Sequence, residues 1–141
     1  MFQIKVKLRE GAKAPTRAHS ADAGLDLYCP ESGAQIIEAK DSVTIDTGVS
    51  IQIPPGYAGF LKSKSGLNVR HGIQSEGVID SGYTGTIVVK LYNHSGREYE
   101  IKAGDKISQL VIVPVMTQEI LIVDELDKTE RGDNGFGSSG R

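Results

Sequence analysis

The stretch Gly77-Val78-Ile79-Asp80-Ser81-Gly82-Tyr83-Thr84-Gly85 predicts a reversal between two β-strands. Asp80 follows two apolar residues, and the ring of Tyr83 comes three positions later. The next run, residues 86–92, is rich in β-branched and aromatic side chains and predicts the strand that leaves the turn. A carboxylate at a hairpin mouth beside a flat ring can activate a water next to a bound ring or sugar. The alternative is ordinary turn chemistry, in which Asp80 bonds its own backbone.

The segments on either side of this reversal also have the period of a strand. Residues 43–53 alternate apolar and polar side chains, with an interruption at Gly48 that indicates a bulge or bend. The first strand has four apolar residues on one face, namely Phe2, Ile4, Val6 and Leu8. Further strands are expected at residues 36–37, 57–61, 98–102, 106–115 and 119–123, and a short helical turn near 67–70. Many short strands between Gly/Pro turns predict an all-β fold, a jelly-roll-like β-sandwich or barrel.

We expect one domain over residues 1–130 and a flexible Gly-rich C-terminal arm over residues 131–141. The arm sequence has no period and would ordinarily be a floppy tail. Its flexible N–H groups, its guanidinium and its paired hydroxyls are nevertheless suited to a phosphate, and Phe136 is suited to stack on a base.

Composition excludes several classes of function. A hydrophobic fraction of 38% and a net charge of -2 argue against a disordered tail and against a binder of nucleic acid polymers. An anionic ligand must therefore be held by a local group of cations. The single cysteine, Cys29, indicates a reducing compartment. Because the sequence has no signal-peptide core and no apolar run of membrane-spanning length, we expect a cytoplasmic protein without a membrane partner.

Three further stretches carry polar groups that could serve a site. Asp26 stands between Leu25 and Leu27, so it either faces solvent or holds a metal-bound water. Residues 62–67 combine two lysines and two serines at a Gly turn, a composition that suits phosphate. Gln109 interrupts the longest apolar strand, and a partly buried amide needs hydrogen-bond partners.

Two other kinds of chemistry find little support. Asp46-Thr47-Gly48 is similar to the active-site triplet of aspartic proteases, but the required apolar-apolar-Gly element is missing from residues 120–123, so we predict a turn or bulge. No histidine has a His or Cys at ligand spacing; the three are His19, His71 and His94. If a metal is used, oxygen ligands and bound phosphates indicate Mg²⁺.

Taken in order, five stretches resemble the trimeric deoxyuridine triphosphatase (dUTP pyrophosphatase) family. They are residues 23–27, 64–67, 77–85, 104–110 and 131–140, and the resemblance runs from about residue 13 to the end. It implies a jelly-roll homotrimer in which each active site draws residues from all three subunits. It also implies hydrolysis of dUTP to dUMP and pyrophosphate with Mg²⁺, which removes dUTP from the nucleotide pool and supplies dUMP for thymidylate synthesis.

The resemblance assigns roles to residues of the hairpin. Asp80 would orient and activate the water that attacks the α-phosphorus. Tyr83 would lie against the deoxyribose and leave no room for a 2′-hydroxyl. The backbone of the hairpin, with Gln74, Val78 and Ile79, would read the uracil edge and exclude the methyl group of thymine.

Other implied roles concern the phosphates and the arm. Lys64, Ser65, Gly66 and Gln109 would hold the phosphate chain. Asp26 would bond water around a Mg²⁺ that is held mainly by the substrate. The arm would close over the nucleotide, with Phe136 over the uracil and with Arg131, Ser138 and Ser139 on the phosphates. Gly137 would be a further substrate-binding residue of the arm.

The sequence departs from the family pattern at three places. Lys64 stands where Arg is usual, and a lysine cannot bind two oxygens in a fork. Gln74 stands where Asn is common, and Asp133-Asn134 stands where a second Gly is frequent. The nearest alternative enzyme is a dCTP deaminase of the same fold, and an alternative of another class is a regulatory protein with nucleotide as its switch. The Gly-rich arm and the Gly-Val-Ile-Asp hairpin favour the pyrophosphatase.

Overall fold

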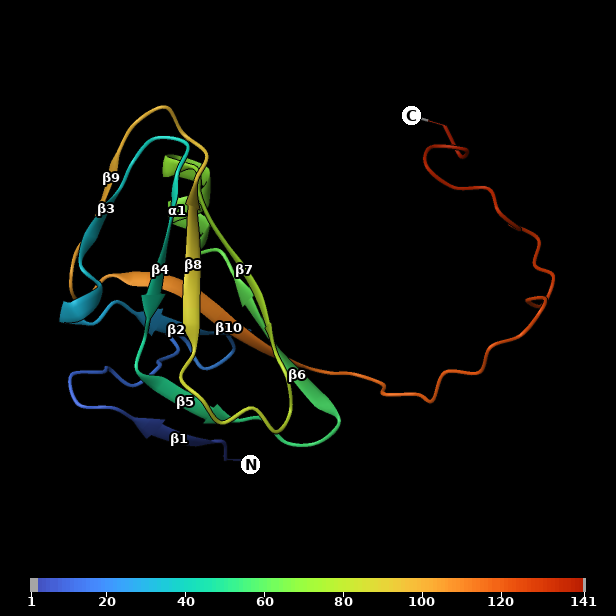
Figure 1. Cartoon of the computed structure of the whole chain (residues 1–141), viewed down its shortest axis with the longest axis horizontal. Helices are drawn as coiled ribbons and strands as arrows, with labels where there is room; N and C mark the ends of the chain where they lie inside the picture. Colours follow the sequence, from blue (N-terminus) through green and yellow to red (C-terminus); the bar gives the residue numbers. More distant parts are fainter. Residues whose placement is uncertain (1–2, 141) are drawn as a thin grey trace.

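The computed structural model describes residues 3–140, which form short antiparallel strands, one α-helix and a long C-terminal arm (Figure 1). The elements are β1 (Lys5–Leu8), β2 (Gly24–Tyr28), the 3₁₀ turn η1 (Glu31–Gly33), β3 (Gln35–Ile37), β4 (Ser42–Asp46), β5 (Val49–Gln52), β6 (Tyr57–Lys62), α1 (Ser65–His71), β7 (Ile73–Ile79), β8 (Val88–Asn93), β9 (Tyr99–Ile101) and β10 (Lys106–Pro114). The prediction of an all-β fold is confirmed, and so is the short helical turn, which is α1.

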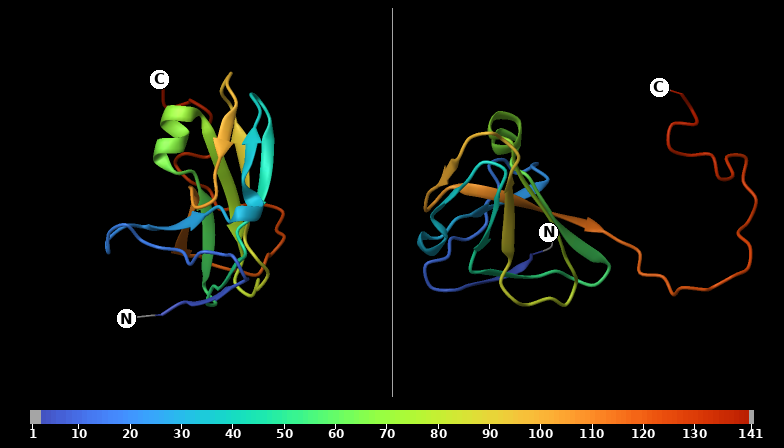
Figure 2. Two further views of the ribbon diagram at one scale, coloured as in Figure 1. Left: turned by 90° about the vertical axis from the view of Figure 1, so that its left-hand side faces the viewer. Right: turned by 45° about the horizontal axis from the view of Figure 1, so that its top comes forward.

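The strands wrap around one apolar core (Figure 2). The main sheet has the order β2-β10-β6-β7-β8-β4, and two smaller sheets pair β1 with β5 and β3 with β9. Alternate residues of these strands point inward and are almost fully buried; among the largest are Leu27, Ile37, Ile45, Ile51, Ile73, Leu91, Ile101, Ile107 and Leu110. Burial of this apolar face is the main force that curls the sheet around the core.

The interruption predicted at Gly48 is confirmed as a corner between β4 and β5. Gly48 has φ +70°, a backbone conformation that residues other than glycine rarely adopt. Asp46 and Thr47 therefore belong to a sharp bend, as predicted. The triplet resembles that of aspartic proteases in residue types only.

The hairpin between β7 and β8 is confirmed, but its two strands separate before they reach the turn. They pair only where Ile73–Ser75 lie opposite Leu91–Asn93. Beyond that point β7 pairs with β6, from Glu76 to Ile79, while β8 pairs with β4. The turn at residues 80–87 therefore bridges a wide mouth between two diverging strands (Figure 1).

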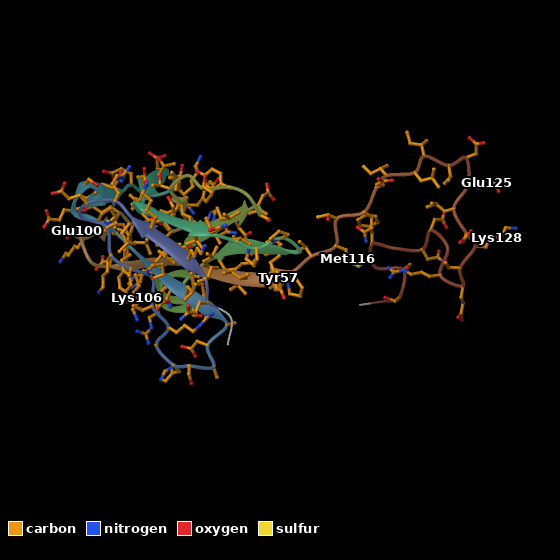
Figure 3. All side chains as sticks on the ribbon, turned by 90° about the horizontal axis from the view of Figure 1, so that it is seen from below. Tyr57, Glu100, Lys106, Met116, Glu125 and Lys128 are labelled. Atoms are coloured by element: carbon orange, nitrogen blue, oxygen red, sulfur yellow. The ribbon has the colours of Figure 1, made fainter. Side chains whose placement is uncertain are left out.

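Both ends of the chain differ from expectation. Val6 and Leu8 of β1 are 40% and 42% exposed, so the apolar face predicted for this strand is only partly covered; Phe2 lies outside the described residues. The strand predicted at residues 119–123 is wrong for the single chain, because no strand within residues 3–140 pairs with it. Residues 115–140 instead form an arm that leaves the body beside Tyr57 (Figure 3). No helix among the described residues is long and apolar enough to cross a membrane.

Candidate active site

The open mouth of the β7–β8 hairpin holds a small pocket that contains both residues singled out in the sequence. Its volume is about 210 Å³, and its lining consists of Val78, Ile79, Asp80, Tyr83, Thr86 and Val88. The pocket exists because β8 has left β7 and no side chain of the core fills the gap. Asp80 and Tyr83 thus share one cavity, which the spacing of the sequence alone could not establish.

The ring of Tyr83 is fixed by its near neighbours in the turn. Its hydroxyl donates a hydrogen bond of 2.9 Å to the carbonyl oxygen of Thr86. The ring also lies across Gly85, where a Cβ would stand 2.5 Å from the Tyr83 hydroxyl. Asp80 is exposed, and its carboxylate has no hydrogen-bond or ion-pair partner among residues 3–140. The alternative in which the Asp80 side chain caps its own turn is therefore wrong.

A second polar group surrounds Asp26 on β2. Only 4% of Asp26 is exposed, so the solvated alternative is wrong for this residue. One carboxylate oxygen binds Lys64, and the other lies 3.0 Å from Nζ of Lys106. Burial acts to raise the pKa of Asp26, but the hydrogen bonds and charges of the two lysines outweigh it and hold the pKa below its ordinary value.

Gln109 on β10 completes this second group. It lies opposite Asp26 in the β2–β10 pair and opposite Lys62 in the β10–β6 pair. Its Nε2 donates a 2.9 Å hydrogen bond to the carbonyl oxygen of Ser63, which satisfies the partly buried amide. Its Oε1 occupies the space that a side chain at Gly24 would need, so glycine is required there. Lys64, Ser65 and Gly66 lie beside this group at the start of α1.

The structure does not bring the remaining predicted residues to either group. Gln74 lies at the paired end of β7, where its Oε1 is 2.7 Å from Nε2 of His94, and five residues of strand, roughly 17 Å, separate it from Ile79. The C-terminal arm lies away from the body of its own chain (Figure 1), and it contains the predicted residues Arg131, Phe136, Gly137, Ser138 and Ser139.

Two residues of the site were missed by reasoning from the sequence. Lys106 binds Asp26, and its only signal was a cation three positions before Gln109 in the 104–110 stretch. Thr86 accepts the Tyr83 hydrogen bond through its backbone, which leaves no trace in the identity of the residue.

The two polar groups stand at opposite ends of one strand. Gly59 pairs with Ile79 at the Asp80 end of β6, and Gln109 pairs with Lys62 at the Lys64 end. If the register is continued by one residue, position 58 lies opposite Asp80, and the six steps from there to Lys64 span roughly 20 Å of extended chain. In Figure 3, Lys106 of the Asp26 group lies on the opposite side of the body from Tyr57 and from the start of the arm at Met116.

Comparisons with known proteins agree on one family. The dUTPase family model matches residues 10–140. The deoxyuridine 5′-triphosphate nucleotidohydrolase of Candida albicans is 44% identical over 142 residues, which cover 98% of this chain and 88% of that protein. The corresponding protein of Eremothecium gossypii is 41% identical over 140 residues, which cover 97% of this chain and 90% of its own length.

Solved structures give the same result for the fold. The dUTPase of Staphylococcus bacteriophage 80alpha, determined with dUpNHpp, is similar over the whole of both chains, with a TM-score of 0.91 and 32% identity. A variant of the dUTPase from phage phi11 of S. aureus, described for its coordination of a structural Mg(II) ion, covers 88% of this chain and 98% of its own, with a TM-score of 0.80 and 32% identity. The chain belongs to the dUTPase family.

Proposed function

We propose that this chain, a dUTP diphosphatase by its family, uses Asp80 to activate the water that attacks the α-phosphorus of dUTP. The products are dUMP and pyrophosphate, so the reaction removes dUTP from the nucleotide pool and supplies dUMP for thymidylate synthesis. One observation above all supports the role of Asp80: its carboxylate has no partner within residues 3–140. Its acceptor positions therefore remain open to a water at the rim of the pocket.

The pocket also supports the reading of sugar and base. The Tyr83 ring would pack against the deoxyribose, and a 2′-hydroxyl pressed against it would lose its partners at a cost of roughly 1–3 kcal/mol. Between Glu76 and Ile79, β7 pairs with β6 along one edge, and no strand of the described chain pairs with the other. Successive residues of a strand point their N–H and C=O groups to opposite edges, so one of the pair Val78 and Ile79 has these groups on the open edge, where they are available to bond the uracil edge.

The phosphates belong with the group around Asp26. Lys64 and Lys106 supply positive charge that a protein with a net charge of -2 lacks overall, and Ser65, the backbone of Gly66 and the amide of Gln109 supply further polar contacts. In the assembled site the ammonium group of Lys64 would interact with the phosphate chain as well as with Asp26.

The donor set fits Mg²⁺ held mainly by the substrate. No three His, Cys, Asp or Glu side chains within residues 3–140 gather as a metal site. Each oxygen of Asp26 contacts one lysine and keeps a further lone pair, which can accept a hydrogen bond from metal-bound water. Mg²⁺ bound in this way would offset the charge of the triphosphate.

The separation of the two groups supports an active site shared between chains. The phosphates of a nucleotide adjoin its sugar, so Asp80 and Lys64 cannot serve one substrate across roughly 20 Å. In a homotrimer, Asp80 and Tyr83 of one chain would face Lys64 and Gln109 of a neighbour.

The arm fits the same assembly. Ile120, Leu121 and Ile122 are 92%, 82% and 92% exposed in the single chain, an amount of apolar surface that is expected to be covered by another copy. Beyond this segment, the arm would bring Arg131, Phe136 and Gly137 with Ser138 and Ser139 over the nucleotide. The activity belongs in the cytoplasm, since the single Cys29 is a buried free thiol.

The experiment that tests the role of Asp80 separates turnover from binding. Asp80→Asn removes the base and keeps the shape, so turnover should fall by at least about a hundredfold. Calorimetric titration with a non-hydrolysable dUTP analogue should give a Kd within severalfold of the wild-type value. Loss of binding together with turnover would show that Asp80 is a structural residue. Release of ammonia from dCTP would instead identify a deaminase.

A further inference from the structure

The β4–β5 corner clamps the end of the turn that carries Tyr83. The backbone N–H and the Oγ1 of Thr47 both donate to the carbonyl oxygen of Ile87, at 3.0 and 2.8 Å. The N–H of Ile87 donates to the carbonyl oxygen of Val49 at 2.8 Å. Thr47 and Ile87 are both fully buried, so these bonds are shielded from water. The position of Ile87 is thereby fixed relative to the corner.

Asp46 extends this clamp to the residue that bonds Tyr83. Its Oδ2 accepts hydrogen bonds from Oγ1 of Thr86 and from the guanidinium of Arg9, both at 3.1 Å. Its Oδ1 accepts a 2.9 Å hydrogen bond from the N–H of Gly48. Partial burial acts to raise the pKa of Asp46, but these hydrogen bonds and the charge of Arg9 outweigh it and hold the pKa below its ordinary value.

A continuous chain of contacts thus joins Arg9 to the nucleotide pocket. Arg9 holds Asp46, Asp46 holds the side chain of Thr86, and the backbone carbonyl of Thr86 holds the hydroxyl of Tyr83. Gly85 lies close against the hydroxyl end of the same ring. The pairing between β7 and β8 ends at Ser75 and Leu91, well before the turn, so this pairing does not hold the Tyr83 ring in place.

We propose that the corner at residues 46–49, together with Arg9, positions Tyr83 and so sets how strictly the enzyme rejects ribonucleotides. This proposal rests on the proposed contact between Tyr83 and the deoxyribose. Asp46 and Arg9 act here as positioning residues: they touch Thr86, not the substrate. A ring held in place leaves no room for a 2′-hydroxyl, whereas a loosened ring can retreat and admit ribose.

The direct test is Thr86→Val, which removes the bond to Asp46 and keeps the shape of the side chain. We expect the ratio of kcat/KM for dUTP over UTP to fall about tenfold, the effect of losing one hydrogen bond to a charged group. The ratio for dUTP over dTTP should stay constant, because the part of β7 proposed to read the base is held by its pairing with β6 and not by the bond between Thr86 and Asp46. Thr86→Ser keeps a hydroxyl and should restore the dUTP/UTP ratio.

A matched control lies on the same strand as Asp46. Thr44 is exposed on β4, and Thr44→Val makes the same chemical change away from the corner, so both ratios should stay at the wild-type values. Gly85→Ala offers a second variant that leaves the corner intact, since its Cβ would displace the Tyr83 ring and lower the dUTP/UTP ratio.

Tyr83→Ala distinguishes the proposed contact between Tyr83 and the sugar from the proposed positioning of Tyr83 by the corner. If Tyr83→Ala lowers the dUTP/UTP ratio while Thr86→Val, in a protein of unchanged Tm, does not, the clamp is overturned and the role of Tyr83 stands. If Tyr83→Ala itself leaves the ratio unchanged, the proposed contact with the sugar fails and the clamp fails with it. A parallel fall in the dTTP ratio in Thr86→Val would show a general loss of structure and would also overturn the proposal.

Discussion

Asp80 and Lys64 lie beside opposite ends of strand β6, roughly 20 Å apart along that strand, although the proposed reaction places both beside one triphosphate. Neither can move to the other, because β6 is paired on both sides, with β10 and with β7. Under the proposed function, a second copy of the chain would close this distance. A shared site of this kind can be tested by mixing variants, without a structure of the homotrimer.

Mixing two inactive variants should restore activity. Asp80→Asn and Lys64→Ala each inactivate every site of a homotrimer, but a mixed trimer contains sites that take Asp80 from one chain and Lys64 from another. After denaturation and refolding of an equal mixture, about one quarter of the sites should be intact. The measurement is the rate of pyrophosphate release from dUTP, compared with each variant refolded alone. Activity that stays at the level of the single variants would place both residues in one chain.

Removal of residues 131–141 should leave a folded protein with little activity. The fully buried core residues all lie before position 111, and residues 131–140 lie apart from the body of their own chain (Figure 1), so the Tm should change by only a few degrees. Activity should fall because the lid that limits access of water is lost. Thermal unfolding and pyrophosphate release on the same sample test the two halves of the prediction. Normal turnover by the truncated chain would refute the assignment of the arm as a lid.

Stability should decline in acid through Asp26 and Asp46. The pKa of each lies below its ordinary value of 3.8, because hydrogen bonds and charges outweigh the opposite effect of burial. A lowered pKa in the folded state contributes stability above about pH 4, and this contribution is lost as the pH falls through the lowered pKa. Urea unfolding between about pH 6 and pH 2 should show this decline in the wild type.

Asp26→Asn provides the control for that measurement. The variant should be less stable than the wild type at neutral pH, because Lys64 and Lys106 lose their partner. It should lose less stability between neutral pH and acid than the wild type does. An identical acid dependence in the two proteins would mean that Asp26 does not carry the effect.

Much of this fold could be predicted from the period of the sequence. Alternation located the segments that became β4, β6 and β10, and the Gly48 interruption was placed correctly. The strand at residues 119–123 was wrong because alternation reports a side chain pattern, while a strand needs a partner, and the single chain provides none. The same limitation hid the separation of β7 and β8, which depends on β6 and β4 competing for their edges.

The site was predicted in its residue types more than in its geometry. Asp80 and Tyr83 were found because they stand together in one turn, and the structure gives them a common pocket. The sequence could not decide whether Asp26 faces solvent or holds a metal-bound water. Its burial between Lys64 and Lys106 depends on segments 38 and 80 residues away. The clamp at Asp46 was invisible for a similar reason: its partners are Arg9 and Thr86, and only the folded chain brings them together.

The central claim is that the Asp80 pocket selects dUTP and hydrolyses it. The most direct measurement is the release of pyrophosphate from dUTP, dTTP, dCTP and UTP in parallel, with Mg²⁺ and with Asp80→Asn as the control. We predict strong preference for dUTP in the wild type, and loss of at least about a hundredfold of that rate in Asp80→Asn. Comparable rates on all four nucleotides, or an Asp80→Asn variant as active as the wild type, would contradict the account.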